Sequence, residues 1–177
     1  MDKKSRANIT DTQTAVFSYP ELEIVWTHRS WGNAPDPDYP WAAIIYGENG
    51  TLKASVNRYE FIPRGKGERI RRDVVMELDK FPADQTEKDL EKHVAPAIRG
   101  HMTDFLKKIA SRGKPVADIE QGHISSAACI LANVALETGR TLHWDAAAGE
   151  VKNDPDANRL LRRPYRAPWE HPEPGNV

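Results

Sequence analysis

Four residues near the expected end of a strand are of types that can bind a small polar ligand, and they are Trp26, His28, Arg29 and Trp31. Aromatic faces stack on sugar rings, and histidine or arginine side chains hydrogen-bond to hydroxyl groups. His28, Arg29 and Trp31 are therefore candidate substrate-binding residues for a carbohydrate. Packing in the core and at its rim explains the same residues, and we favour that interpretation.

His123 is a second candidate substrate-binding residue, one turn into a helix that Asp118 is expected to cap. The helix dipole disfavours imidazolium there, and a neutral imidazole could hydrogen-bond to a sugar hydroxyl or lie near a cofactor. A structural histidine that holds Asp118 or a neighbouring strand is the alternative. We favour the alternative because the sequence shows no partner base. No residue is assigned a catalytic role.

Other polar patterns favour structural explanations. Arg64–Arg72 could contact phosphate, but a single basic run without interleaved aromatic residues is typical of an exposed loop. Cys129 is expected to be a buried, inert thiol. Four arginines of the tail could pair with carboxylates across a subunit contact or could simply be solvated. They are Arg159, Arg162, Arg163 and Arg166.

Composition narrows the class of protein. The chain has 177 residues, 39% of them hydrophobic, and a net charge of −1, which indicates a globular domain without nucleic-acid or membrane partners. A single cysteine excludes an intramolecular disulfide, and the histidine spacings favour no metal site. There is no apolar run near the roughly 20 residues of a membrane span, and the N-terminus lacks a signal-like apolar segment. We therefore expect a cytoplasmic location by default.

The first half of the sequence predicts antiparallel strands. Thr14–Tyr19 and Leu22–Arg29 form one expected hairpin, and a proline-rich loop follows at Gly32–Pro40. Trp41–Tyr46 and Thr51–Asn57 form a second hairpin around Asn49-Gly50, which tolerates positive φ. Two further strands are expected at Tyr59–Ile62 and Asp73–Leu78.

The second half predicts two helices. The first carries apolar residues at helical spacing between Ile98 and Ile109 and ends at Gly113. The second begins after Asp118, with Gln121 as its capping-box partner, and ends at Gly139. Its expected apolar stripe consists of Ile124, Ala127, Leu131, Val134 and Ala135.

An ordered set of short sequence pieces resembles the C-terminal domain of bacterial oxidoreductases of the Gfo/Idh/MocA type. The pieces are Tyr46–Leu52, His101–Pro115, Gly122–Ala128, Gly139-Arg140, Leu142, Trp144-Asp145, Ala157–Leu161 and Arg163–Trp169. The resemblance implies an α+β fold, an open-faced and predominantly antiparallel sheet covered on one face by helices. We expect this domain at residues 12–169, between a linker or disordered N-terminus at 1–11 and a flexible tail at 170–177.

The resemblance also implies NAD or NADP as the cofactor of the complete enzyme and a sugar or polyol as its substrate. The sequence shows no recognisable Rossmann domain, which binds the cofactor in this family. Gly65-Lys66-Gly67 lacks the third glycine of a dinucleotide-binding turn and lies in a basic loop. The family's Glu-Lys-Pro segment is absent, and Asp89–His93 has the Asp-x-x-x-His spacing only by coincidence.

The sequence therefore predicts a substrate-side and oligomerisation domain that is inactive alone. Its expected partners are a Rossmann domain in the same gene or a neighbouring chain, and further copies of itself bound through the open sheet face. Trp26, Ile24, Trp41, Ile44 and Tyr46 are the residues expected to supply that face. A free-standing carbohydrate-binding or oligomerisation module without a redox role is the alternative.

Overall fold

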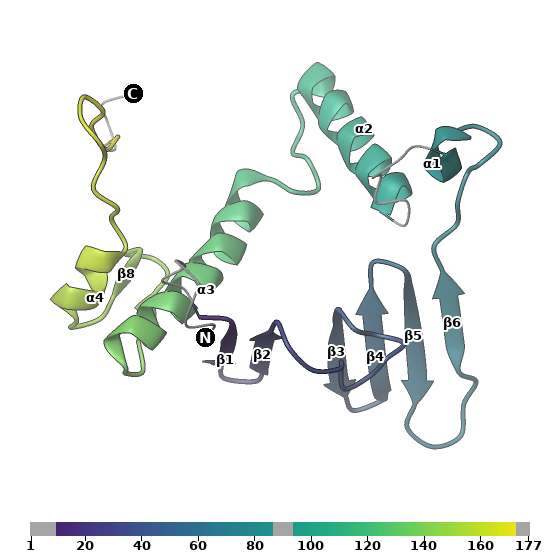
Figure 1. The fold of residues 1–177 in the computed structure, drawn as a ribbon, viewed down its shortest axis with the longest axis horizontal. Helices are drawn as coiled ribbons and strands as arrows, with labels where there is room; N and C mark the ends of the chain where they lie inside the picture. The colour runs from purple at the N-terminus through teal and green to yellow at the C-terminus, as the bar shows by residue number, and fades with distance from the viewer. Residues whose placement is uncertain (1–9, 87–93, 173–177) are drawn as a thin grey trace. The chain divides into compact units, whose positions relative to one another are not determined.

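The computed structural model describes residues 10–86 and 94–172. By its contacts the chain divides into a first unit, residues 1–116, and a second unit, residues 117–177, and each is treated separately below. The predicted α+β class is confirmed, because the described strands pair antiparallel and the chain also forms helices, most of them after the first six strands (Figure 1).

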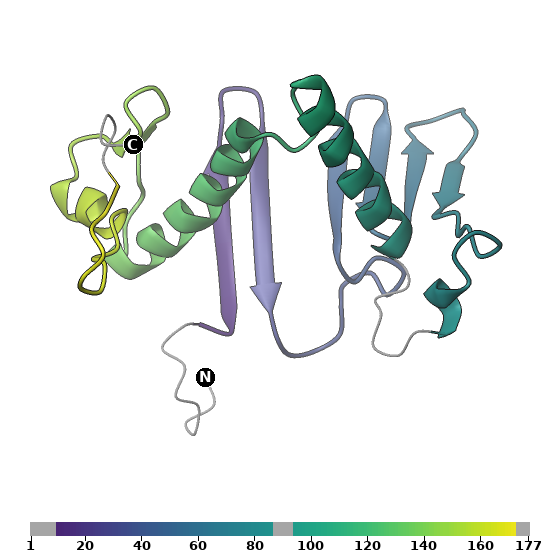
Figure 2. The same cartoon turned by 90° about the horizontal axis from the view of Figure 1, so that it is seen from above.

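The first unit begins with a hairpin of β1, Thr12–Ser18, and β2, Glu23–Arg29 (Figure 2). The register pairs Thr12 with Arg29 and Ser18 with Glu23. The backbone N–H of Tyr19 donates to the carbonyl of Leu22 at 2.8 Å and closes the turn. This confirms the predicted first hairpin.

A four-stranded sheet follows in the order β3-β4-β5-β6. Its strands are β3 (Ala42–Gly47), β4 (Gly50–Ser55), β5 (Arg58–Pro63) and β6 (Ile70–Asp73). The last strand corrects the prediction of a strand at Asp73–Leu78. Ile70 pairs with Phe61 and Arg71 with Glu60, so the basic run forms the edge strand instead of remaining a loop throughout.

The register gives this sheet two chemically different faces, because successive side chains of a strand point to opposite sides. One face carries an apolar row from four strands: Ile45, Leu52, Phe61 and Ile70. The other face carries a row that is mostly charged: Ile44, Lys53, Glu60 and Arg71.

Two helices complete the first unit, α1 at Ala83–Thr86 and α2 at Ala95–Ser111. The guanidinium of Arg99 binds both carboxylate oxygens of Asp84 at 2.8 and 2.6 Å, which joins the two helices. Arg99 also lies 3.8 Å from the centroid of the Phe81 ring. Asp84 is buried and therefore requires this partner. Asp89–His93 lies outside the described residues.

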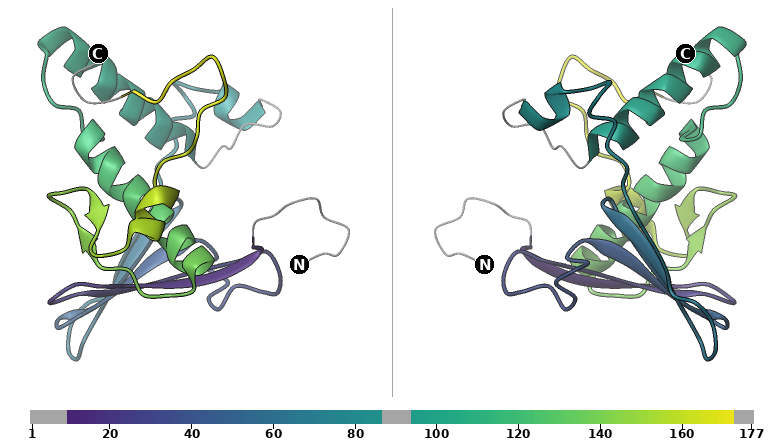
Figure 3. Two further views of the ribbon diagram at one scale, coloured as in Figure 1. Left: turned by 90° about the vertical axis from the view of Figure 1, so that its left-hand side faces the viewer. Right: turned by 90° about the vertical axis from the view of Figure 1, so that its right-hand side faces the viewer.

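The second unit is built on α3, Ile119–Thr138 (Figure 3). The predicted N-cap at Asp118 and the predicted end at Gly139 are confirmed. The Asp118 carboxylate accepts from the backbone N–H groups of Glu120 and Gln121, and Gly139 ends the helix at φ 67°. The predicted stripe is only partly correct, because Val134 is buried whereas Ile124 is 55% exposed. Cys129 is exposed, which corrects the prediction of a buried thiol.

In the second unit, a small hydrophobic core joins α3 to a short hairpin near the C-terminal end and to a short helix. The hairpin pairs β7, Trp144–Asp145, with β8, Glu150–Val151, and α4 follows at Pro155–Leu160. The core consists of three buried side chains and four partly buried ones around them. They are Val134, Val151, Ala157, Leu131, Leu142, Trp144 and Leu161.

The turn between β3 and β4 leads to the first prediction. Gly50 has φ 150°, and a β-carbon there would meet the Ile62 carbonyl and the α-carbon of Pro63. We expect Gly50→Ala to lower the free energy of unfolding by about 2 kcal/mol or more.

Gly47→Ala in the same turn is the matched control. Its β-carbon would lie 3.7 Å from the Gly50 carbonyl oxygen, an ordinary contact. Chemical denaturation of both variants measures the difference. Equal stability of the two variants would show that Gly50 is not held by this close approach.

Candidate functional site

The predicted carbohydrate cluster is divided into two pairs by the strand geometry. His28 and Arg29 are adjacent on β2 and so point to opposite faces of the hairpin. On one face the rings of Trp26 and His28 stack, with centroids 5.8 Å apart and an interplanar angle of 8°. The other face carries Arg29, which lies with Trp31. Alternation along a strand is the physical reason that four nearby residues do not form one site.

Arg29 and Trp31 form the pair with more contacts to neighbouring groups. The Trp31 indole N–H donates to the Thr12 hydroxyl at 2.8 Å, which fixes the ring across β1. The Arg29 guanidinium lies 5.6 Å from the centroid of that ring and donates to the Asn33 carbonyl at 2.6 Å. Trp31 is 60% exposed, so this pair presents an aromatic surface beside a hydrogen-bond donor. Such a surface can stack on a sugar ring and bind its hydroxyls.

His123 lies in the first turns of α3 in the second unit and is exposed. Asp118, its suggested structural partner, uses its carboxylate to cap the helix. Within the part of the chain that the structure describes, no hydrogen bond of His123 is seen. Its role in binding substrate stays a prediction.

A charged cluster on the first unit's sheet was not anticipated from the sequence. Lys53 binds Asp36 at 2.6 Å and lies 5.3 Å from the centroid of the Tyr39 ring, so the loop before β3 is held to β4. The neighbouring Glu60 is 2% exposed and accepts from Arg69 at 2.6 Å. These contacts join segments far apart in sequence, and the local pattern gives no signal for them.

Electrostatics within this cluster favour fixed charges over proton transfer. The hydrogen bond from Arg69 lowers the pKa of Glu60, and that from Lys53 lowers the pKa of Asp36. Burial raises the pKa of Tyr39, and the Glu60 carboxylate raises it further. The Tyr39 hydroxyl is buried and has no hydrogen-bond partner among the described residues. The described contacts of this cluster therefore hold a loop against the sheet.

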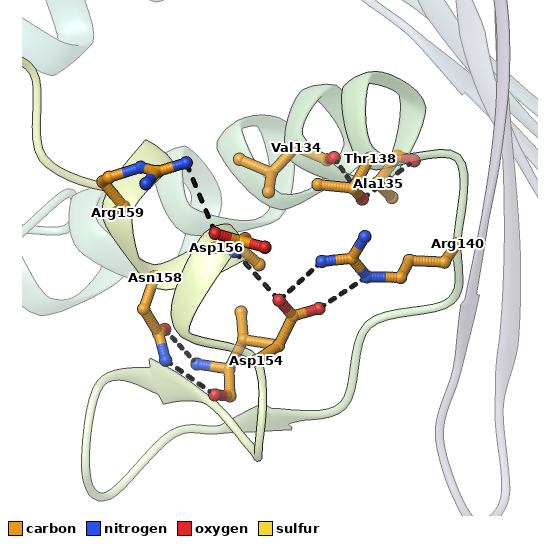
Figure 4. A network of polar contacts seen from close by, with 10 residues as sticks. Val134, Ala135, Thr138, Arg140, Asp154, Asp156, Asn158 and Arg159 are labelled. Carbon is orange, nitrogen blue, oxygen red and sulfur yellow. Dashed lines mark hydrogen bonds and ion pairs between the residues drawn. The ribbon is translucent and has the colours of Figure 1, made fainter.

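A second polar network closes the core of the second unit (Figure 4). Arg140 donates to the two carboxylate oxygens of Asp154 at 2.8 and 2.7 Å, and Asp154 also caps α4 by accepting from the Ala157 N–H. Asn158 exchanges hydrogen bonds with the backbone of Val151 at 2.7 and 2.8 Å. The Asp-Pro pair that begins α4 is a recognisable cap signal that the sequence analysis missed.

Among the described residues, the Gly65–Gly67 stretch does not form a dinucleotide-binding turn. Gly65–Gly67 lies between β5 and β6, two antiparallel strands, whereas a pyrophosphate turn leads from a strand into a helix. A β-carbon at Gly67 would meet the Pro63 ring at 2.9 Å, so this glycine serves close packing within the turn. The described strands contain no parallel pair.

Among the side chains that the structure describes, no three of histidine, cysteine, aspartate or glutamate converge as metal ligands. The helices in the same described ranges are too short or too polar to cross a bilayer.

Comparison with known proteins gives one finding. The family model described as "Oxidoreductase family, C-terminal alpha/beta domain" matches residues 75–171, more than half of the chain. The match begins after β6, so the six preceding strands lie outside it. No curated protein and no solved structure gave a significant match.

The Asp154 network leads to a prediction about acid stability. Arg140 lowers the pKa of Asp154 to about 2. A lowered pKa in the folded state stabilises the protein above the ordinary aspartate pKa of 3.8, and this stabilisation is lost as the pH falls toward 2. We expect Asp154→Asn to lower the Tm by several degrees at pH 7, and the difference from wild type to shrink between pH 4 and pH 2.

Asp156→Asn is the control, because the Asp156–Arg159 pair is exposed and contributes little. Thermal unfolding at a series of pH values measures both variants. A Tm difference for Asp154→Asn that does not depend on pH would contradict the role assigned to its charge.

Proposed function

The chain belongs to the oxidoreductase family defined by this C-terminal α/β domain, and from that membership we propose that it is the substrate-side and oligomerisation domain of an NAD(P)-dependent oxidoreductase. The proposed substrate is a sugar or polyol, oxidised at a hydroxyl group. A Rossmann domain in the same gene or a neighbouring chain would hold NAD or NADP and supply the hydride chemistry. The cytoplasm is the location we assign by default.

The exposed Arg29–Trp31 pair supports a sugar or polyol substrate. The indole ring is held by Thr12 and supported by Arg29, so its orientation is set before a ligand arrives. The apolar C–H face of a sugar ring packs on such a surface, and the remaining guanidinium donors suit its hydroxyls. These residues would bind and orient the substrate, while the reacting groups come from the cofactor domain.

The apolar face of the four-stranded sheet supports the oligomerisation role. Ile45 is 53% exposed, and Ile70 at the other edge of the same row is also exposed. Large apolar surfaces of this kind usually contact a partner. The register also changes the set of residues expected for this contact, because Ile44 and Tyr46 lie on the charged face.

Lysine substitutions on the apolar face and on the charged face of the four-stranded sheet test the oligomerisation role. We expect the wild-type chain to form a dimer or larger assembly of the 19.9 kDa protomer. Ile45→Lys should yield monomers, because a lysine in the apolar contact would lose its hydration. Light scattering coupled to gel filtration measures the mass.

Ile44→Lys introduces the same charge at the neighbouring position on the opposite face and should leave the assembly intact. A monomeric wild type at high protein concentration would refute the oligomerisation role. Dissociation by both variants would refute its assignment to the apolar face.

The substrate role is tested in an enzyme reassembled with its cofactor domain. We expect Trp31→Ala, Arg29→Gln and His123→Ala each to raise the KM for a sugar or polyol by roughly tenfold, with kcat nearly kept. Thr12→Val removes the acceptor of the indole N–H but keeps the ring, so its effect on KM should be smaller. Steady-state kinetics with thermal unfolding separates binding from stability.

A variant that loses several degrees of Tm but keeps normal KM per folded molecule would show a structural role for that residue. If the reassembled protein oxidises no sugar or polyol while this chain alone still binds them, the free-standing binding module becomes the correct interpretation.

A further inference from the structure

Three of the four tail arginines, which the proposed function leaves unused, line an open cavity in the second unit. Its volume is about 650 Å³, which lies within the range of small-molecule sites. The lining residues follow one another around the end of α4, and they are Arg159, Leu160, Arg162, Arg163, Pro164, Tyr165 and His171.

The charge of this cavity is one-sided. Three of its lining residues are arginines, a fourth is a histidine, and none is acidic. The carboxylate of Asp156 reaches Arg159 at 3.3 Å, but both side chains are more than two-thirds exposed, and such pairs are weak. Arg163 forms no ion pair with any residue in the described ranges. Three arginines around one cavity, with no acidic residue in its lining, favour an anion there.

Guanidinium also favours a particular kind of anion. Its planar fork of N–H donors matches two oxygens of one phosphate or carboxylate, which makes such pairs stronger and more directional than contacts to a simple ion. Arg159, Arg162 and Arg163 line the same cavity, so more than one of them can bind a single oxyanion.

The remaining lining residues favour a ligand with a ring. The Tyr165 and His171 rings meet at a centroid distance of 5.2 Å and an angle of 46°, which forms an aromatic corner. Leu160 and Pro164 add apolar surface. A concave site of this size suits a small molecule better than the broad surface of a macromolecule.

We propose that this cavity is a binding site for a small molecule that carries a phosphate or carboxylate group, such as a phosphorylated sugar or a sugar acid. The site is distinct from the Arg29–Trp31 pair, which belongs to the first unit. It does not depend on the proposed redox role, because a free-standing binding module would keep the same cavity.

The test titrates the full 177-residue chain with inorganic pyrophosphate and, separately, with citrate, at constant ionic strength. Calorimetry is expected to show saturable binding of at least one. The double variant Arg162→Gln/Arg163→Gln should weaken it by about tenfold or more, since two charge-assisted hydrogen-bond partners are lost. Pyrophosphate binding alone would assign a phosphate ligand, and citrate binding would assign a carboxylate.

Arg64→Gln/Lys66→Gln is the matched control, because it removes two positive charges from an exposed turn of the first unit. Equal weakening by both double variants would overturn the proposal in favour of a general electrostatic effect. Absence of saturable binding to either anion would also overturn it.

Arginine side-chain NMR of the wild-type chain decides the matter if the Arg162→Gln/Arg163→Gln variant does not fold. Shifts of the Nε signals of Arg162 and Arg163 on adding the anion would support the site. Shifts confined to other arginines would overturn it.

Discussion

Arginine–carboxylate pairing is the interaction on which most of this structure depends. Three carboxylates withdrawn from water, those of Glu60, Asp84 and Asp154, each bind one arginine at 2.6 to 2.8 Å. Each pair joins separate segments: the loop before β6 to β5, α1 to α2, and the end of α3 to the start of α4. Few apolar side chains are buried among the described residues, so these contacts carry much of the tertiary connection.

This kind of pairing has a definite energetic character. A buried carboxylate without its arginine is strongly destabilising, although an intact pair contributes little net free energy over an apolar replacement. The main effect of these pairs is therefore to favour one arrangement of the segments over others. Their net contribution to the free energy of folding is small. The Arg140–Asp154 pair shows this best, because the same carboxylate both fixes the position of α4 and caps it.

Local signals in the sequence predicted much of the fold. The hairpin around Gly50 and the Asp118 cap depend on residues within a few positions of one another, and both were confirmed. The strand Ile70–Asp73 was predicted in the wrong place because Arg71 and Arg72 mask its pattern, and Arg71 pairs with Glu60, eleven positions earlier. The turn between β3 and β4 also differs in detail from the prediction. Glu48 and Asn49 occupy its centre, and the positive φ is at Gly50.

The candidate site was harder to predict than the elements that carry it. Residues 28, 29 and 31 were correctly placed at a strand end, and alternation along the strand would have separated His28 from Arg29. The contacts of Asp36, Tyr39 and Lys53 depend on how a proline-rich loop folds over a sheet. No periodicity in one sequence encodes that path, so physical reasoning from local patterns could not reach it.

The opposed faces of the four-stranded sheet have a consequence for how the chain reaches its native pairing. A slip of one residue between two of these strands would turn every side chain of one strand to the wrong side. If β4 slipped in this way, Lys53 would lie in the apolar row, while Leu52 would point to the charged face. Misaligned pairings are therefore high in free energy. The alternation of charged and apolar residues thus disfavours the wrong registers while the sheet forms.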